Sequence, residues 1–194
     1  REEQHLWAES YDRDLSEVLG LQREVARTIA GEIRITVTPQ EQAQLAAGRR
    51  VDPEVHQLVL RGQYYANKGL EEDLKKALDY FDQAIAREPS YAPAHAGLAF
   101  SYKNLASVYR PPREVMPKAR AAAQRALDLD ETLADAHITL AGVLLFYDWD
   151  WPAAEKHLKR ATELSPNSAA AHVLYGSYFT ALGRPQESLA EIRL

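Results

Sequence analysis

The sequence predicts a mainly α-helical chain, a solenoid of repeated helix pairs over residues 49–194, preceded by a small strand-helix-strand segment over residues 1–48. Two observations predict the solenoid. From Asp52 onward every segment has helical patterning, with apolar residues at the three- and four-residue spacing of amphipathic helices. A frame of small and large apolar residues also returns along this part of the chain.

Composition excludes several classes of protein. The 194 residues contain no cysteine, which rules out disulfides, thiolate zinc sites and cysteine nucleophiles. The formal net charge of −5 disfavours nucleic acid as a partner, because phosphate binding needs a clustered basic face. No apolar run approaches the ~20 residues of a membrane span. We expect a cytoplasmic protein, with an extracytoplasmic part of a membrane-anchored protein as the alternative.

The first 48 residues contain two predicted strands and a helix. His5 to Tyr11 alternates and carries two aromatic residues, and Ile33, Ile35 and Val37 alternate with polar residues before Pro39. Between them, apolar residues at helical spacing predict about five turns of helix: Val18, Leu21, Val25, Ile29 and Ile33. Two strands and one helix are too few for a stable sheet domain, so we expect this segment to end a domain that begins before Arg1.

The helical part contains an internal repeat. Asp52 and Pro53 mark a helix start, because Pro is tolerated at the first helical position. The repeat frame is Ala, a large apolar residue four positions on, Ala three further and Pro after that. It is filled by Ala77, Phe81, Ala84 and Pro89, by Ala154, Leu158, Ala161 and Pro166, and in part by Ala119, Ala123 and Ala126. A helix with small residues precedes each copy, including Gly62, Ala99 and Ala141, and Gly176 opens a further copy.

This frame resembles the tetratricopeptide repeat (TPR), a helix-turn-helix unit of about 34 residues. The resemblance implies a right-handed α-solenoid with three complete repeats, at about 53–89, 90–131 and 132–166, and a truncated fourth at 167–194. The small residues recur at intervals longer than 34 residues. We therefore expect extra residues in the turns within repeats, most of all at Val108 to Arg113.

A narrower resemblance concerns the parent protein. Residues 5–15 and 21–26, together with Thr38 to Gln42, Tyr147 to Trp151 and Leu182 to Arg184, resemble a TolB-like domain followed by TPRs in large bacterial signalling proteins. Residues 1–48 would then be the C-terminal part of the TolB-like domain. In that group the module follows a winged-helix DNA-binding domain, a serine/threonine kinase domain or a nucleotide cyclase domain, and no residue here belongs to such an effector.

Three histidines recur in register, His95, His137 and His172, each preceded by Ala. A shared metal site would need their nitrogens about 2 Å from one ion, whereas neighbouring helices lie about 8–10 Å apart. Because the TPR frame has large packing residues at these places, we interpret the three histidines as packing residues. No metal and no cofactor are expected.

The segment Tyr147 to Trp151 is dense in aromatic and acidic residues. Two carboxylates beside indoles suit a saccharide or general-acid site. The structural alternative, which we favour, is that Asp150 caps a helix starting near Pro152 while Trp149 and Trp151 anchor the turn. No phosphate-binding glycine loop and no nucleophile motif is present. We therefore expect no enzyme activity in this chain. The parent protein could be a serine/threonine kinase or an adenylate cyclase, and the sequence does not decide between them.

The concave face is the remaining candidate site. The TPR resemblance assigns to this partner groove ten residues of the inner helices: Val59, Gln63, Asn67, Phe100, Lys103, Asn104, Ile138, Leu145, Phe146 and Val173. Chaperone-binding relatives carry a Lys/Asn/Arg clamp for a C-terminal carboxylate. That clamp is absent, because the matching positions hold Val59, Gln63, Gly97, Asp135 and Thr139. An apolar groove favours a helix or an extended peptide. The alternative is a groove covered by the chain's own N-terminal helix or by a segment beyond Leu194.

The predicted function is that of a non-catalytic protein–protein interaction module in a larger bacterial signalling or regulatory protein. The alternative is a ligand-sensing region that controls a kinase, cyclase or DNA-binding effector. A homodimer is also expected, because the predicted strand at residues 5–11 offers an unpaired edge.

Overall fold

The computed structural model describes Val25 and residues 52–193. The chain divides into two compact units, Arg1–His56 and Gln57–Leu194, and the second holds most of what is described. Val25 is helical, as the pattern of residues 18–33 predicts. Both predicted strands, and with them the unpaired edge, lie outside the described residues.

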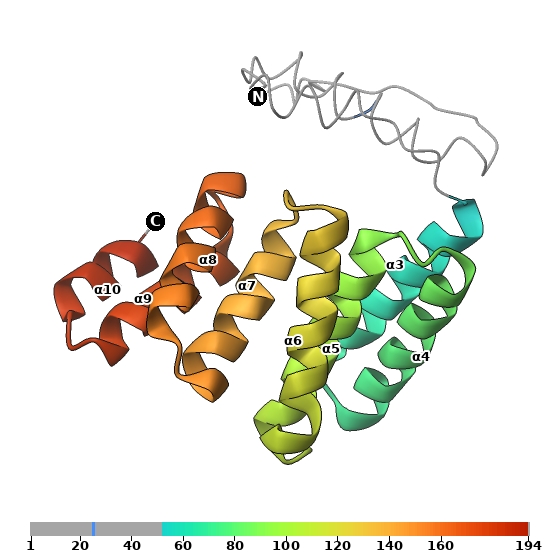
Figure 1. Ribbon diagram of the computed structural model, residues 1–194, viewed down its shortest axis with the longest axis horizontal. Helices are drawn as coiled ribbons and strands as arrows, with labels where there is room; N and C mark the ends of the chain where they lie inside the picture. The colour runs from blue at the N-terminus through green and yellow to red at the C-terminus, as the bar shows by residue number, and fades with distance from the viewer. Residues whose placement is uncertain (1–24, 26–51, 194) are drawn as a thin grey trace, which may run out of the picture. The chain divides into compact units, whose positions relative to one another are not determined.

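Helices follow one another along residues 52–193, and this part of the chain contains no strand (Figure 1). They are α3 (Pro53–Lys68), α4 (Glu71–Arg87), α5 (Ala92–Val108), α6 (Pro112–Leu129), α7 (Ala134–Val143), the π-helical turn η2 (Leu144–Asp148), α8 (Trp151–Leu164), α9 (Ala169–Ala181) and α10 (Pro185–Ile192).

Each helix from α4 onward packs against the next, and short turns join them into hairpins. The first helices of successive pairs also touch, α5 against α7 and α7 against α9. They form one layer, and the second helices form the other (Figure 1). The predicted mainly α-helical solenoid is therefore confirmed for the residues described.

The frame residues form the core between helices. Phe81 is fully buried, and its ring lies where Cβ atoms at Gly62 and Gly97 would come within 2.6 and 2.3 Å of it. Real Cβ atoms essentially never approach that closely, so both glycines are required for the α3 and α5 backbones to close over the ring. The alanine and leucine residues of the frame are also fully buried: Ala77, Ala84, Ala119, Ala123, Ala126, Ala154, Leu158 and Ala161.

The prediction of long turns within repeats is wrong at its main position. Val108 is the last residue of α5 and Pro112 the first of α6, so the turn is Tyr109 to Pro111. The extra residues lengthen the two helices, which have 17 and 18 residues. The turn stays tight because the N–H groups of Tyr109 and Arg110 both donate to the Leu105 carbonyl.

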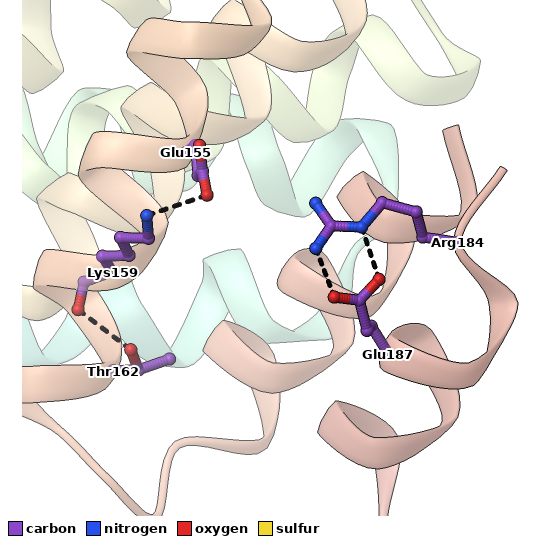
Figure 2. Close-up of polar contacts among 5 residues, drawn as sticks. All are labelled: Glu155, Lys159, Thr162, Arg184 and Glu187. Atoms are coloured by element: carbon purple, nitrogen blue, oxygen red, sulfur yellow. Dashed lines mark hydrogen bonds and ion pairs between the residues drawn. The ribbon is translucent and has the colours of Figure 1, made fainter. Parts of the chain in front are cut away.

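Ion pairs on the outer surface support the last helices (Figure 2). In α8, Lys159 Nζ lies 2.8 Å from the carboxylate of Glu155, one turn earlier, and the Thr162 hydroxyl donates to the Lys159 carbonyl. At the start of α10, the Arg184 guanidinium binds both oxygens of Glu187. Exposed pairs of this kind contribute little stability each, because water and salt screen the attraction. Of the helices described, none is long and apolar enough to cross a membrane.

Candidate binding groove

A groove of about 540 Å³ lies over the layer of first helices. Most of its lining comes from α5, α7 and α9, which pack side by side, with further residues from α3. Its lining residues are Gln63, Ala66, Asn67, Phe81, Pro93, Ala96, Gly97, Phe100, Lys103, Leu133, Asp135, Ile138, Thr139, Ala170, Val173, Leu174 and Ser177. Most of these are apolar, so the groove is suited to bind apolar side chains of another molecule.

The structure brings together six of the ten residues assigned to the groove from sequence: Gln63, Asn67, Phe100, Lys103, Ile138 and Val173. They come from four helices, and the stacking of helix pairs places them along one surface. Val173 is 54% exposed, so its side chain is accessible to a partner.

The other four assigned residues lie elsewhere. Val59 is only 2% exposed, because it falls on the buried stripe of α3 that includes Gly62 and Ala66. Leu145, 1% exposed, belongs to the core, and Phe146, 56% exposed, lies outside the groove. Both belong to η2, whose wider π-helical turn rotates them relative to the register of α7. The fourth, Asn104, is half-buried on α5 and does not line the groove.

Other lining residues were not assigned from sequence, chiefly Pro93, Leu133 and Leu174. Pro93 lies in the first turn of α5, and Leu133 is the residue before α7. The positions of Pro93 and Leu133 at the helix starts could have predicted their place in the lining, because the first turn of each inner helix borders the groove as the middle turns do.

The groove contains one basic and one acidic residue, Lys103 and Asp135, among the residues that line it. Burial lowers the pKa of the Lys103 ammonium, because removal from water disfavours its charged form. Lys103 Nζ is 5.5 Å from the centroid of the Phe100 ring. Within the described part of the chain no group of three or more metal-ligating side chains occurs. This arrangement is suited to binding.

The three histidines in register are buried and share one contact. His95, His137 and His172 each place Nε2 within 3.0 Å of the carbonyl oxygen six residues earlier, those of Pro89, Glu131 and Pro166. Each ring thus forms a hydrogen bond between an inner helix and the turn that precedes it. Their interpretation as packing residues is confirmed.

Two of these histidines have second partners that were not predicted from the sequence. His137 Nδ1 lies 2.8 Å from His157 Nδ1 on α8, and His172 Nδ1 lies 2.7 Å from Glu191 Oε2 on α10. The repeat frame could not predict these contacts. Each partner lies on the next helix, and the turn between the two helices determines which residue of that helix faces the histidine.

The aromatic-acidic segment forms the turn between η2 and α8. Asp150 caps α8 by accepting from the Ala153 N–H at 3.1 Å, so the predicted cap is confirmed. Arg120 holds Asp148 at 2.8 Å. Trp149 does not anchor the turn: it is 70% exposed and has left-handed backbone, with φ of 60°. Its ring centroid lies 6.4 Å from that of the half-buried Trp151.

Comparison with known proteins gives one similar curated protein and several similar structures. No family model matches the chain. The curated relative is "Putative adenylate cyclase 3" of Rhizobium meliloti (strain 1021), 32% identical over 146 residues, which cover 71% of this chain. The chain spans about a quarter (24%) of that relative's length.

The similar structures are TPR proteins. TTC0263, a thermophilic TPR protein of Thermus thermophilus, has a TM-score of 0.61 at 18% identity, covering 91% of this chain and 86% of its own. The first TPR of Spaghetti (RPAP3), bound to the HSP90 peptide SRMEEVD, has a TM-score of 0.55 at 20% identity, covering 70% of this chain and 99% of its own. MamA follows, with a TM-score of 0.54 at 19% identity, covering 94% and 93%. The fold is therefore a TPR-type right-handed α-solenoid.

Proposed function

We propose that this chain is a protein-interaction module that binds a helix or extended segment of a partner protein in the groove. The observation that carries the proposal is the apolar groove of about 540 Å³ formed by three adjacent inner helices. Phe100, Ile138 and Val173 come from three different helices and contribute apolar surface to it. A partner that covers them buries apolar area, which is the main driving term in protein association.

Similarity supports the mode of binding. The first TPR of Spaghetti (RPAP3) is described as bound to an HSP90 peptide, and it has the fold of this chain. The identity of the partner does not transfer with the fold. Val59, Gln63 and Gly97 occupy positions where chaperone-binding relatives carry clamp residues, so we propose a partner other than a chaperone C-terminus.

A matched pair of variants tests the groove. Val173 lines it at 54% exposed, and Phe146 lies outside it at 56% exposed. Val173→Gln should reduce the recovery of specific partners in a quantitative pull-down at least about fivefold, whereas Phe146→Gln should leave recovery unchanged. Equal recovery by the wild-type chain and Val173→Gln would contradict a partner in the groove.

The same variants test the alternative occupant, a segment of this chain. If such a segment covered Val173, Val173→Gln would lower the unfolding temperature and leave partner recovery unchanged. Phe146→Gln again serves as the control, because it removes a comparably exposed apolar side chain at another place.

We propose further that the module belongs to a larger bacterial signalling or regulatory protein, with residues 1–48 as the end of a TolB-like domain. The relative of Rhizobium meliloti supports this setting, since it is about four times as long as the matched region. Its name favours a nucleotide cyclase as the effector over a kinase or a winged-helix domain. The sequence of the full open reading frame tests the proposal, which fails if no effector domain is encoded.

A second candidate function is that of a ligand-sensing region controlling such a cyclase. The cyclase name of the relative favours it, and the groove volume falls within the range of small-molecule sites. A thermal-shift screen with a panel of metabolites tests it. A compound that raises the unfolding temperature, and loses this effect in Val173→Gln, supports the sensor. A panel without any such compound counts against it.

We also propose a cytoplasmic location, a homodimer and no binding to nucleic acid. The net charge of −5 supports the last of these. Cell fractionation of the host, light scattering at high protein concentration and a fluorescence titration with DNA and RNA test the three in turn. A membrane or periplasmic fraction, a monomer, or saturable binding to nucleic acid would each overturn the corresponding statement.

A further inference from the structure

Lys103 is a basic residue in the apolar groove that has no counter-ion among residues 52–193. Across residues 52–193, no carboxylate lies within 4.0 Å of its ammonium. Its side chain is half-buried and its methylene stem passes over α7, where a Cβ on Gly142 would lie 3.4 Å from Lys103 Cδ. Burial also lowers the pKa of this ammonium, because removal from water disfavours its charged form.

Several cations on the described helices have carboxylate partners, and others, such as Lys118, lie outside the groove. Lys75 pairs with Glu71 and Glu72, and Arg120 pairs with Asp148 at 2.8 Å. Lys103 therefore differs from them in its lack of a partner and in its place among Phe100, Ile138 and the other lining residues. A partly desolvated charge gains more from an opposite charge than a fully hydrated one does, because screening by water is weaker.

We propose that the groove selects partner segments in which an acidic side chain is flanked by apolar residues, with the carboxylate pairing to Lys103 and the apolar residues contacting Phe100, Ile138 and Val173. The inference rests on the proposed function and specifies the chemistry of the partner. One ammonium suits one side-chain carboxylate. The positions from which relatives bind a chain terminus provide no cation here, since they hold Val59, Gln63, Gly97, Asp135 and Thr139.

Asp135 gives the bound segment a direction. It lines the groove seven residues before Gly142 on the inner helix, which is two turns or about 10 Å along the axis. Because Lys103 Cδ lies 3.4 Å from a Cβ built on Gly142, the positive charge lies nearer the C-terminal part of α7, whereas the negative charge of Asp135 lies in its first turn. A partner segment therefore binds with its acidic residue toward Lys103 and a basic residue toward Asp135.

The first experiment uses two small probes of the same shape, 3-phenylpropionate and its neutral amide 3-phenylpropanamide. Titration of the isotopically labelled chain, followed by NMR, should show shifts at Phe100, Ile138 and Val173 and an affinity for the acid about tenfold above that for the amide. Lys103→Met should abolish the preference. Lys118→Met is the matched control, because Lys118 also lies over an aromatic ring, that of Tyr102, but outside the groove.

Equal affinities for acid and amide, a preference that persists in Lys103→Met, or no binding of either probe would each overturn the inference. These results are distinguishable from failure of the proposed function. If Val173→Gln reduces partner recovery but the acid has no advantage, the groove binds a partner without acidic selection. If the acid is preferred and Val173→Gln leaves recovery unchanged, the groove is selective and the protein-partner function fails.

The second experiment tests direction with a displayed library of 12-residue peptides. Selection on the wild-type chain should enrich peptides with an acidic and a basic residue at a fixed separation. Selection on Lys103→Glu should replace the acidic residue with a basic one, and selection on Asp135→Lys should do the reverse at the other position. Wild-type selection without acidic enrichment, or unchanged residue preferences in Lys103→Glu, would overturn the inference.

Discussion

His137 and His172 occupy the same register on α7 and α9, and yet their surroundings shift their pKa values in opposite directions. Both rings place Nε2 near the carbonyl six residues earlier. A carbonyl only accepts, so Nε2 carries hydrogen in both. The difference lies at Nδ1, which faces His157 in one case and Glu191 in the other.

The two partners select different protonation states. Glu191 can accept a hydrogen from Nδ1, so this contact favours the cationic form of His172, which has hydrogens on both nitrogens. Neutral His137 has its lone pair on Nδ1 and accepts from the Nδ1–H of His157. The repeat frame thus fixes the position of a side chain and its backbone contact, while the neighbouring second helix supplies the partner that differs between the two sites.

The largest effect on this comparison should come from removal of the rings. His137→Leu and His172→Leu keep most of the buried volume and delete the hydrogen bond to the Glu131 or Pro166 carbonyl. Each should lower the free energy of unfolding by about 1 kcal/mol, the net value of a typical hydrogen bond, and His137→Leu by more because His157 also loses its partner. Urea denaturation measures the loss. An unchanged midpoint in both variants would show that the shared contact contributes nothing.

The next effect is a pH dependence of opposite sign at the two sites. Burial lowers the pKa of His137 and of His157, with the positive charge of Arg160 or Lys156 adding to it, while the Glu131 carbonyl opposes it at His137. In the unfolded chain both histidines titrate near 6.5. As the pH falls below that value, the unfolded chain therefore binds more protons than the folded chain does. Their contribution to stability is therefore full above pH 6.5 and is lost as the pH falls.

His172 has the opposite sign. Hydrogen bonding to the Pro166 carbonyl, and then to Glu191, raises its pKa above 6.5. Its contribution is full below 6.5 and is lost as the pH rises through the folded-state value. Urea denaturation between pH 5 and 8 should thus show a steeper rise of stability with pH for His172→Leu than for the wild-type chain, and a flatter one for His137→Leu. Parallel curves for all three would contradict the assignment.

A single substitution should convert one site into the other. His157→Glu gives His137 a carboxylate partner at Nδ1, as Glu191 is the partner of His172 in the next hairpin. The pKa of His137 should therefore move from below 6.5 to above it. NMR titration of the ring protons measures this, with His157→Gln as the uncharged control. A His137 that still titrates below 6.5 in His157→Glu would show that burial outweighs the partner.

These sites illustrate what the sequence could predict. Ala77, Phe81 and Ala84 recur with Ala154, Leu158 and Ala161 because every helix pair meets the same packing constraint, so the fold and its core could be predicted. The recurrence of Ala-His at three places indicated packing residues for the same reason. The contacts to His157 and Glu191 could not be predicted, since they join residues 20 and 19 positions apart on different helices.

The groove shows the same limit. Phe100, Ile138 and Val173 line the groove, because they lie where the helices keep an ordinary α-helical register. Leu145 and Phe146 were misplaced because η2 is π-helical, and nothing in the spacing of apolar residues signalled the wider turn. Residue patterns predict faces of regular helices, and a local change of helix type rotates every later residue of that helix.

The smallest effect should come from Glu191→Gln, which removes the negative charge beside His172 and keeps a side chain that can accept a hydrogen bond. The pKa of His172 should fall, but it should remain above 6.5, because the hydrogen bond to the Pro166 carbonyl is the largest single cause of its rise and stays in place. Glu187→Gln is the control, since Glu187 lies on the same helix and pairs with Arg184 instead. NMR titration of His172 in both variants gives the measurement. A fall to 6.5 or below in Glu191→Gln would show that the second helix alone sets the charge and that the shared backbone contact has no part in it. A partial fall means that the backbone contact shared by His172 and His137 favours the cation, and that the other surroundings of His137 override that contact.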